Sequence, residues 1–214
     1  MSEVRIVPEG DRASGDEAVR VLRDGGLVCY PTDTVYGIGA AAGDDAAVGR
    51  LFAVKGRSPD KPLPLLLADV SDAARVAEVT PLAKALAGWF WPGALTIVMR
   101  KAASYRSLAL AGGDTVALRV PDHGLVRSMV RALGEPITGT SANRTGTRAP
   151  LSAAEVAFQM GGMVELIIDG GQSRTRLEST VIDITRDKPE IVREGAVSRG
   201  EVEKALGQVV RAKA

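Results

Sequence analysis

Apolar residues along this chain follow two patterns, a helical spacing in some segments and short continuous runs in others. The first pattern is typical of helices with one buried face, and the second of buried strands. Capping boxes at 14–17, 152–155 and 198–201, and Thr80 followed by Pro81, mark four helix starts. The continuous runs predict strands at 27–30, 63–68, 95–99, 116–120, 164–168, 180–184 and 190–193, with a shorter one at Ile137.

Helices and strands therefore alternate over the whole length, with no long linker or repeat between them. The strands near 95–120 and 180–193 are too close in sequence for a crossover helix, so each of these pairs must be antiparallel. We predict one α/β domain over 1–214, in three layers, with a twisted mixed parallel and antiparallel sheet and a last helix at about 199–210.

The composition limits which partners and which cellular location we expect for this protein. Lys and Arg number 27 against 26 Asp and Glu, so the net charge of +1 gives no reason to expect a nucleic-acid or membrane partner. A zinc site of Cys and His ligands is excluded, because the chain has only Cys29 and His123. The first residues lack an apolar signal region and no apolar run approaches membrane-spanning length, so we expect a cytoplasmic protein with no membrane partner.

Three polar stretches follow or contain strand-like runs, at 31–37, 138–143 and 178–180. Because small-molecule sites in α/β proteins form where strands end, these hydroxyl and amide groups are expected to meet in one pocket. Positive charge is available from the loop at 55–61 and from two arginines within strands, Arg119 and Arg193. The predicted pocket therefore suits an anionic ligand.

Each motif also has a simpler explanation. Thr, Asp and Asn side chains routinely cap turns, and a short basic cluster is most often a solvated loop. Strand alternation leaves two positions open for Arg119. It could lie on the half-exposed face of a strand, or its guanidinium could bind a carboxylate through paired hydrogen bonds. The motifs contain no evident nucleophile or strong base, which suits a displacement at phosphorus whose nucleophile comes from the substrate.

The motifs occur together in a recognisable order. Taken as a set from about 25 to 196, the chain resembles the YrdC-like family of threonylcarbamoyl-AMP synthases, in its short, single-domain form. The blocks that carry the resemblance are 31–39 (PTDTVYGIG), 55–63 (KGRSPDKPL), 91–96 (WPGALT), 116–121 (VALRVP), 140–143 (TSAN), 179–183 (STVID) and 191–195 (IVREG).

The resemblance implies a nucleotidyltransferase that makes threonylcarbamoyl-AMP and pyrophosphate from L-threonine, bicarbonate and ATP. Mg²⁺ would arrive with the nucleotide, and no residue is assigned to a metal. A separate transferase would use the product to modify tRNA, and direct tRNA contact is possible. The implied catalytic residues are Lys55 and Arg57. The implied ATP contacts are Lys55, Arg57, Lys61, Thr115, Ser141, Asn143 and Arg193, and the implied threonine contacts are Thr34, Tyr36, Arg119, Thr140 and Ser179.

Some positions depart from the family pattern. Members often carry a histidine in the strand after the basic loop, where this chain has 65–67 (LLL), and the sequence after Asn143 also differs. The C-terminal domain of longer relatives is not expected. An RNA-binding module of YrdC type without adenylate-forming activity stays an alternative, because Arg144, Arg148, Arg174 and Arg176 lie in loops. The related segment of hydrogenase maturation proteins is a third possibility.

Overall fold

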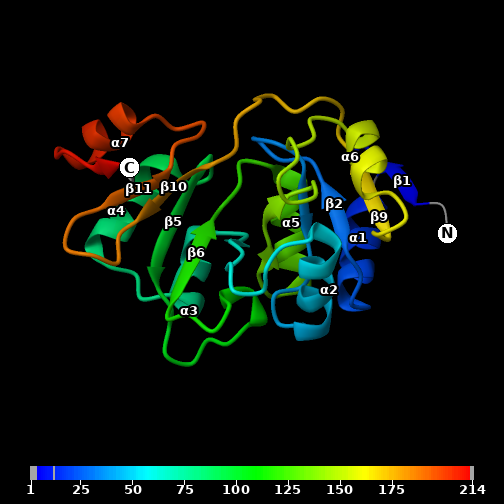
Figure 1. Ribbon diagram of the computed structural model, residues 1–214, viewed down its shortest axis with the longest axis horizontal. Coiled ribbons are helices and arrows are strands. Elements are labelled where there is room, and N and C mark those ends of the chain that lie inside the picture. The colour runs from blue at the N-terminus through cyan, green and yellow to red at the C-terminus, as the bar shows by residue number, and fades with distance from the viewer. Residues whose placement is uncertain (1–3, 12, 213–214) are drawn as a thin grey trace.

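Strands and helices alternate along the computed structural model, which describes residues 4–11 and 13–212 (Figure 1). The strands are β1 (Arg5–Pro8), β2 (Val28–Tyr30), β3 (Gly37–Gly39), β4 (Leu65–Leu66), β5 (Leu95–Arg100), β6 (Thr115–Arg119), β7 (Ile137–Thr138), β8 (Thr140–Ser141), β9 (Leu166–Asp169), β10 (Thr180–Asp183), β11 (Glu190–Arg193) and β12 (Arg211–Ala212). The α-helices are α1 (Ser14–Arg23), α2 (Asp45–Lys55), α3 (Ala73–Val76), α4 (Pro81–Phe90), α5 (Gly124–Leu133), α6 (Ala153–Met160) and α7 (Arg199–Leu206). Two 3₁₀ turns are η1 (Val70–Asp72) and η2 (Leu108–Leu110).

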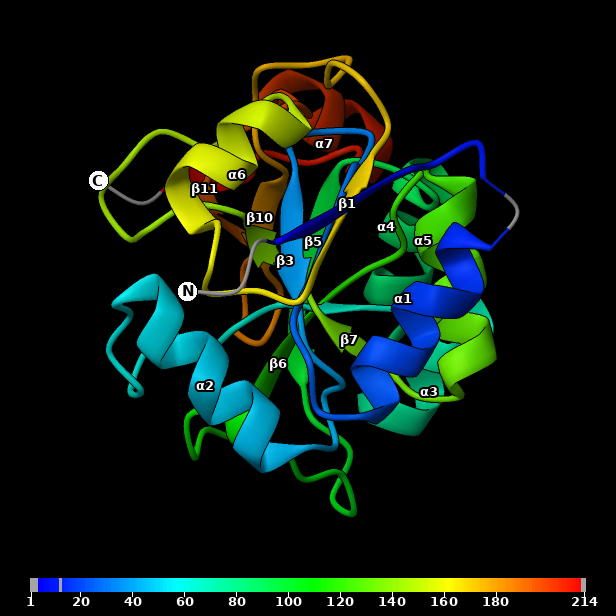
Figure 2. The ribbon, with the colours of Figure 1, turned by 90° about the vertical axis from the view of Figure 1, so that its right-hand side faces the viewer.

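The strands form two mixed sheets, one of five strands in the order β1-β9-β2-β3-β8 and one of seven in the order β12-β11-β10-β5-β6-β4-β7. In Figure 1, β5, β6, β10 and β11 occupy the left half and β1, β2 and β9 the right half. Figure 2 shows α1 beside α5 on one side of the strands, with α2 and α6 on the other. The α/β class and the mixed pairing are as predicted, including the antiparallel pairs β5–β6 and β10–β11.

The sequence predicted one sheet, and the chain makes two because it crosses between them at Gly139. Thr138 pairs with Leu65 in the larger sheet, whereas Thr140 pairs with Ile38 in the smaller one. A Cβ on Gly139 would lie 2.5 Å from Leu66 Cγ, so this close crossing requires glycine.

Helix starts follow the predicted caps in most places. Thr80 Oγ1 accepts from Ala83 N at 3.2 Å, and Ser198 with Glu201 forms the complete capping box. The box predicted at Ser14 is wrong: this residue lies inside α1, and its hydroxyl donates to carbonyl groups of the preceding turn. Of the box at 152–155 only half forms, since Ser152 Oγ accepts from the backbone while the glutamate carboxylate turns to another amide.

Two further segments differ from expectation. The strand predicted at 63–68 is only β4, because β7 on one side pairs with just two of its residues, although Leu63 and Leu67 are buried as predicted. The helix end at 89–91 is apolar in sequence, and we expect such an end to pack on the sheet. Trp91 does pack into the core, and its Nε1 donates to Leu95 O at 2.7 Å, but Trp89 is 69% exposed. Cys29 is fully buried, as expected for a small apolar residue. Across residues 4–11 and 13–212, no helix combines the length and hydrophobicity needed to cross a membrane.

Candidate functional site

A cavity of about 600 Å³ lies between the two sheets, where the three polar stretches meet. Strand ends from both sheets supply its walls, so the expected convergence of these stretches is confirmed. Its lining includes ten of the twelve residues singled out from the sequence: Thr34, Tyr36, Arg57, Lys61, Thr115, Arg119, Thr140, Ser141, Ser179 and Arg193. The volume is in the range of small-molecule sites.

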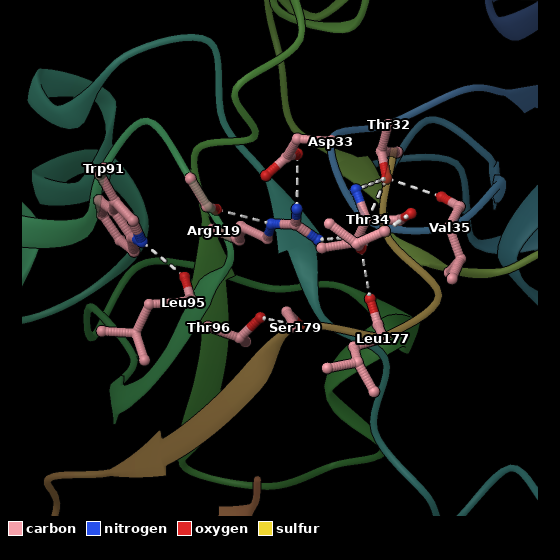
Figure 3. A network of polar contacts seen from close by, with 12 residues as sticks. Thr32, Asp33, Thr34, Val35, Trp91, Leu95, Thr96, Arg119, Leu177 and Ser179 are labelled. Carbon is pink, nitrogen blue, oxygen red and sulfur yellow. Dashed lines mark hydrogen bonds and ion pairs between the residues drawn. The ribbon is translucent and has the colours of Figure 1, made fainter. Parts of the chain in front are cut away.

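Arg119 lies at the end of β6 and is almost fully buried, which excludes the half-exposed surface position. Its guanidinium donates to Gly93 O (2.9 Å), to Thr34 Oγ1 (3.1 Å) and to Asp33 Oδ1 (2.6 Å), as Figure 3 shows for the last two. A guanidinium carries five N–H groups, so two are free of these three contacts. The side chain is thus fixed in place and keeps donors for a ligand.

The hydroxyl groups of Thr32 and Thr34 form a chain of hydrogen bonds beside Arg119. Thr32 Oγ1 donates to Val35 O at 2.6 Å and accepts from Thr34 N at 3.0 Å. The two threonine hydroxyls are 2.9 Å apart, so Thr34 donates to Thr32 and accepts from Arg119. Thr34 is therefore held with its oxygen toward the arginine (Figure 3).

Ser179, which directly precedes β10, joins β5 and β11 of the larger sheet, the sheet that also carries Arg119. Its Oγ lies 2.8 Å from Thr96 Oγ1 on β5 (Figure 3), and Arg193 Nη2 donates to Ser179 O at 2.8 Å. Arg193 also forms an ion pair with Glu178 at 2.8 Å. These contacts fix a hydroxyl and a guanidinium side by side on the cavity wall.

Tyr36 contributes its ring to the cavity, while its hydroxyl is used for structure. The phenol donates to Gly171 O at 2.7 Å and accepts from Gly170 N at 3.1 Å, which holds the loop after β9. Burial raises the pKa of Tyr36 to about 12, so the phenol stays protonated at neutral pH.

Arg57 and Arg193 form a second group of positive charges, which shares no hydrogen-bond partner with Arg119. Arg57 donates to Lys61 O (3.0 Å) and Pro62 O (2.8 Å), so its guanidinium stiffens the basic loop. Burial, and after it the charge of Arg193, lower the pKa of Arg57. The two guanidinium groups therefore repel each other across the cavity, and an anion between them would relieve that repulsion.

Lys55 and Asn143, the other two predicted site residues, do not line the cavity. Lys55 is only 3% exposed, and its Nζ donates to Ser141 O and to Asn143 O (2.7 Å). Thr145 N donates to Lys55 O at 2.8 Å, so lysine and loop are joined twice. Lys55 sits behind the cavity wall because it lies on the buried face of α2, in line with Leu51 and Phe52.

Asn143 likewise supports the wall from behind. Its amide group donates to Thr147 O (2.6 Å) and Arg144 O (3.1 Å), which closes the turn after β8. This is the turn-forming arrangement that the sequence left open as the simpler explanation.

Some lining residues were not singled out from the sequence. Thr96 is a polar residue that is 1% exposed inside an apolar strand, and that position was the available signal. Asp33, which does not line the cavity but holds Arg119, was also not singled out, because its partner lies 86 residues further along the chain. Leu66, at the place where the family often has histidine, makes the wall apolar there.

The fold and the cavity define an α/β protein with a preformed, positively charged small-molecule site between two sheets. The family named Sua5_yciO_yrdC, described as "Telomere recombination", matches residues 20–195, and this chain belongs to that family.

Relatives with a named activity cover most of the chain. A protein of Pyrococcus abyssi named threonylcarbamoyl-AMP synthase is 42% identical over 90% of this chain and 57% of the relative. Its namesake from Bacillus subtilis is 37% identical over 90% of this chain and 56% of the relative. The chain thus spans slightly more than half the length of these two relatives. A putative synthase of Mycobacterium tuberculosis is 38% identical and is covered over 88% of its length.

Solved structures agree with the fold. The crystal structure of P. abyssi Sua5 complexed with L-threonine has a TM-score of 0.92 and 39% identity, over 99% of this chain and 63% of that one. E. coli YciO has a TM-score of 0.84 and 27% identity, over 94% of this chain and all of that one.

The buried Lys55 ammonium makes stability depend on pH. Burial, and after it the charge of Arg57, lower the pKa of Lys55 from 10.5 to about 8. Between these values the unfolded chain binds a proton that the folded chain does not, so the free energy of unfolding should rise with pH there. We expect a rise on the order of 2 kcal/mol, measured by urea denaturation, that is absent in Lys55→Met.

The exposed Lys61 provides the matched control, since Lys61→Met should keep the wild-type slope. If Lys55→Met does not fold, the Lys55 pKa can be titrated directly in the wild type by NMR at the carbon next to Nζ. A pH slope unchanged in Lys55→Met, or a directly measured pKa above 10, would contradict the burial argument.

Proposed function

We propose that this chain is a threonylcarbamoyl-AMP synthase, which joins L-threonine, bicarbonate and ATP and releases pyrophosphate. The observation that carries the proposal is the presence of two cationic groups in one cavity, Arg119 and the pair of Arg57 and Arg193, which share no hydrogen-bond partner. The first suits a carboxylate and the second suits phosphates. The names of the relatives, and the threonine bound to P. abyssi Sua5, support this assignment.

The chemistry proceeds in two steps that need no protein nucleophile. The amine nitrogen of threonine bonds to the carbon of bicarbonate, and water leaves, which gives a carbamate. A carbamate oxygen then bonds to the α-phosphorus of ATP, and the bond from that phosphorus to the bridging oxygen of pyrophosphate breaks. Positioning of the two substrates and stabilisation of phosphate charge are the tasks left to the protein.

Threonine is assigned to the side of the cavity around Arg119. The two free N–H groups of the Arg119 guanidinium can donate to the carboxylate of threonine. The hydrogen bond to Thr34 fixes the orientation of this guanidinium. Ser179 offers a hydroxyl from the same sheet as Arg119. Tyr36 shapes the pocket with its ring, and Thr140 adds a further hydroxyl from β8.

The nucleotide is assigned to the side around the basic loop. Arg57 and Arg193 face the phosphates, where charge builds as pyrophosphate leaves, with Lys61 beside them. Thr115 and Ser141 supply hydroxyl groups from β6 and β8. Lys55 and Asn143 act through this wall, because their side chains hold the backbone of the segment that carries Ser141.

Mg²⁺ enters this scheme as part of the ATP substrate. Two carboxylates reach the cavity, Asp60 and Glu178, and the second is already paired with Arg193. Within the described ranges no three His, Cys, Asp or Glu side chains gather into a metal cluster. The protein therefore offers few oxygen ligands, which fits an ion carried mainly by phosphates and water.

The product would serve tRNA modification, in which a separate transferase moves the threonylcarbamoyl group to an adenosine. A mixed phosphoric-carbamic anhydride is reactive toward water, so the transferase must take it directly after release. Contact between this chain and tRNA stays a prediction, supported only by exposed loop arginines such as Arg144 and Arg174.

The proposal is tested by the substrate dependence of pyrophosphate release. Purified protein should release pyrophosphate only when ATP, threonine and bicarbonate are all present, because the attacking oxygen belongs to the carbamate. Omission of any one should reduce the rate to background in a coupled pyrophosphate assay. Equal release without threonine would refute the synthase assignment and indicate a nonspecific nucleotidase.

A further inference from the structure

A second cavity, of about 430 Å³, lies at the other end of β4 and β7 from the ligand cavity. Along β4, Leu66 lines the first cavity and Leu67 the second. Along β7, Pro136 lines the second cavity and Gly139 the first. The two cavities are therefore distinct, and strands of two residues separate them.

The second cavity has an apolar floor and a fixed frame. Val76 of α3 and Val130 of α5 are both buried and line it, together with Leu67. On the frame, Arg131 and Asp69 form an ion pair at 2.8 Å that links α5 to the turn before α3. A buried apolar floor with a fixed frame favours an apolar ligand body without a large ordering cost.

The three carboxylates of this cavity already have partners. Asp69 pairs with Arg131 and, at 3.6 Å, with Arg127. Asp72 accepts from the backbone N–H of Asp69 at 2.9 Å, and Glu135 accepts from that of Gly43 at 2.7 Å. The charge of Asp69 is thus offset by two arginines, whereas Asp72 and Glu135 are fixed by backbone N–H groups that leave their negative charges in place.

Two exposed arginines, Arg75 and Arg106, line the mouth of this cavity. In the part of the chain that the structure describes, Arg75 and Arg106 form no ion pair. Arg75 donates to Gly134 O at a long 3.4 Å, and Arg106 donates only to carbonyl groups of its own loop. Tyr105 lies between floor and mouth, and burial raises its pKa to about 12, so it is a neutral donor.

We propose that this second cavity binds a small organic anion with an apolar body. The anionic group would lie at the mouth on Arg75 and Arg106, and the body would lie against Val76 and Val130. An aromatic carboxylate is the simplest member of this class, because it joins one planar anion to one compact apolar group. Guanidinium forks match carboxylates in geometry as well as charge.

The experiment uses the full chain with labelled methyl groups and follows NMR shifts during titration with 2-naphthoate. We expect the methyl groups of Val76 and Val130 to shift with saturation. The neutral analogue 2-naphthylmethanol, and 2-naphthoate added to Arg75→Gln or Arg106→Gln, should each bind about tenfold more weakly, as for loss of one charge-assisted contact. Arg100→Gln is the matched control, since Arg100 lies outside both cavities and pairs with Asp114, and it should bind like wild type.

Three outcomes would overturn the proposal. The first is an absence of shifts at Val76 and Val130 up to millimolar 2-naphthoate. The second is equal affinity for the neutral alcohol, or for both arginine variants. The third is a set of shifts confined to Val98 and Val181, which line the first cavity and would place the probe there. None of these readouts depends on turnover, so they are independent of the proposed reaction.

Discussion

Arg57→Ala should lower the rate of pyrophosphate release roughly a hundredfold, the scale seen when one preorganised electrostatic group is removed. The reason is that Arg57 and Arg193 are held close enough to repel each other, so both charges are available to phosphates as negative charge develops. Arg57→Lys should recover part of the rate, because it restores the charge without the fork. Steady-state kinetics with ATP, threonine and bicarbonate measure the effect.

The same variant separates the enzyme from an RNA-binding module. If the basic loop contacts an RNA backbone instead, Arg57→Ala should leave adenylate formation intact and flatten the salt dependence of tRNA binding by about one unit of slope. Arg100→Ala is the matched control, since Arg100 is exposed, lies outside the cavity and is not one of the loop arginines that support RNA contact. Wild-type turnover in Arg57→Ala would contradict the synthase proposal, and we expect turnover to collapse.

Arg119→Ala should weaken threonine binding by about 1.5–3 kcal/mol, as for a charge-assisted contact, and leave ATP binding nearly unchanged. We expect this asymmetry because Arg119 and Arg57 share no hydrogen-bond partner, and the charge that lowers the pKa of Arg57 is that of Arg193. Isothermal titration with threonine and, separately, with a non-hydrolysable ATP analogue measures both affinities.

Removal of Arg119 alone would leave the buried Asp33 carboxylate without its partner, which destabilises a fold. The double variant Asp33→Asn/Arg119→Ala removes that charge as well and tests threonine binding in a folded protein. Arg100→Ala, which removes an exposed arginine of β5, is the control for loss of positive charge. If the folded double variant bound threonine as tightly as the wild type, Arg119 would have only a structural role.

Neighbouring residues were enough to predict the elements and the polar stretches. Thr80 with Pro81, and Ser198 with Glu201, define helix starts through contacts that reach only three residues along the chain. The prediction failed at Ser14, because its hydroxyl donates to carbonyl groups three and five residues earlier instead of accepting from the first turn of the helix.

The sequence by itself determined the α/β alternation, the mixed pairing and the collection of hydroxyl and cationic groups at strand ends. Only the tertiary structure decided that the chain divides into two sheets at Gly139, that Asp33 pairs with Arg119, and that Lys55 turns behind the cavity wall. These features depend on residues 86 or more positions apart, or on which sheet a two-residue strand joins. Spacing along a sequence specifies local periodicity and turn chemistry, whereas such long-range partners are chosen by the packing of the whole chain.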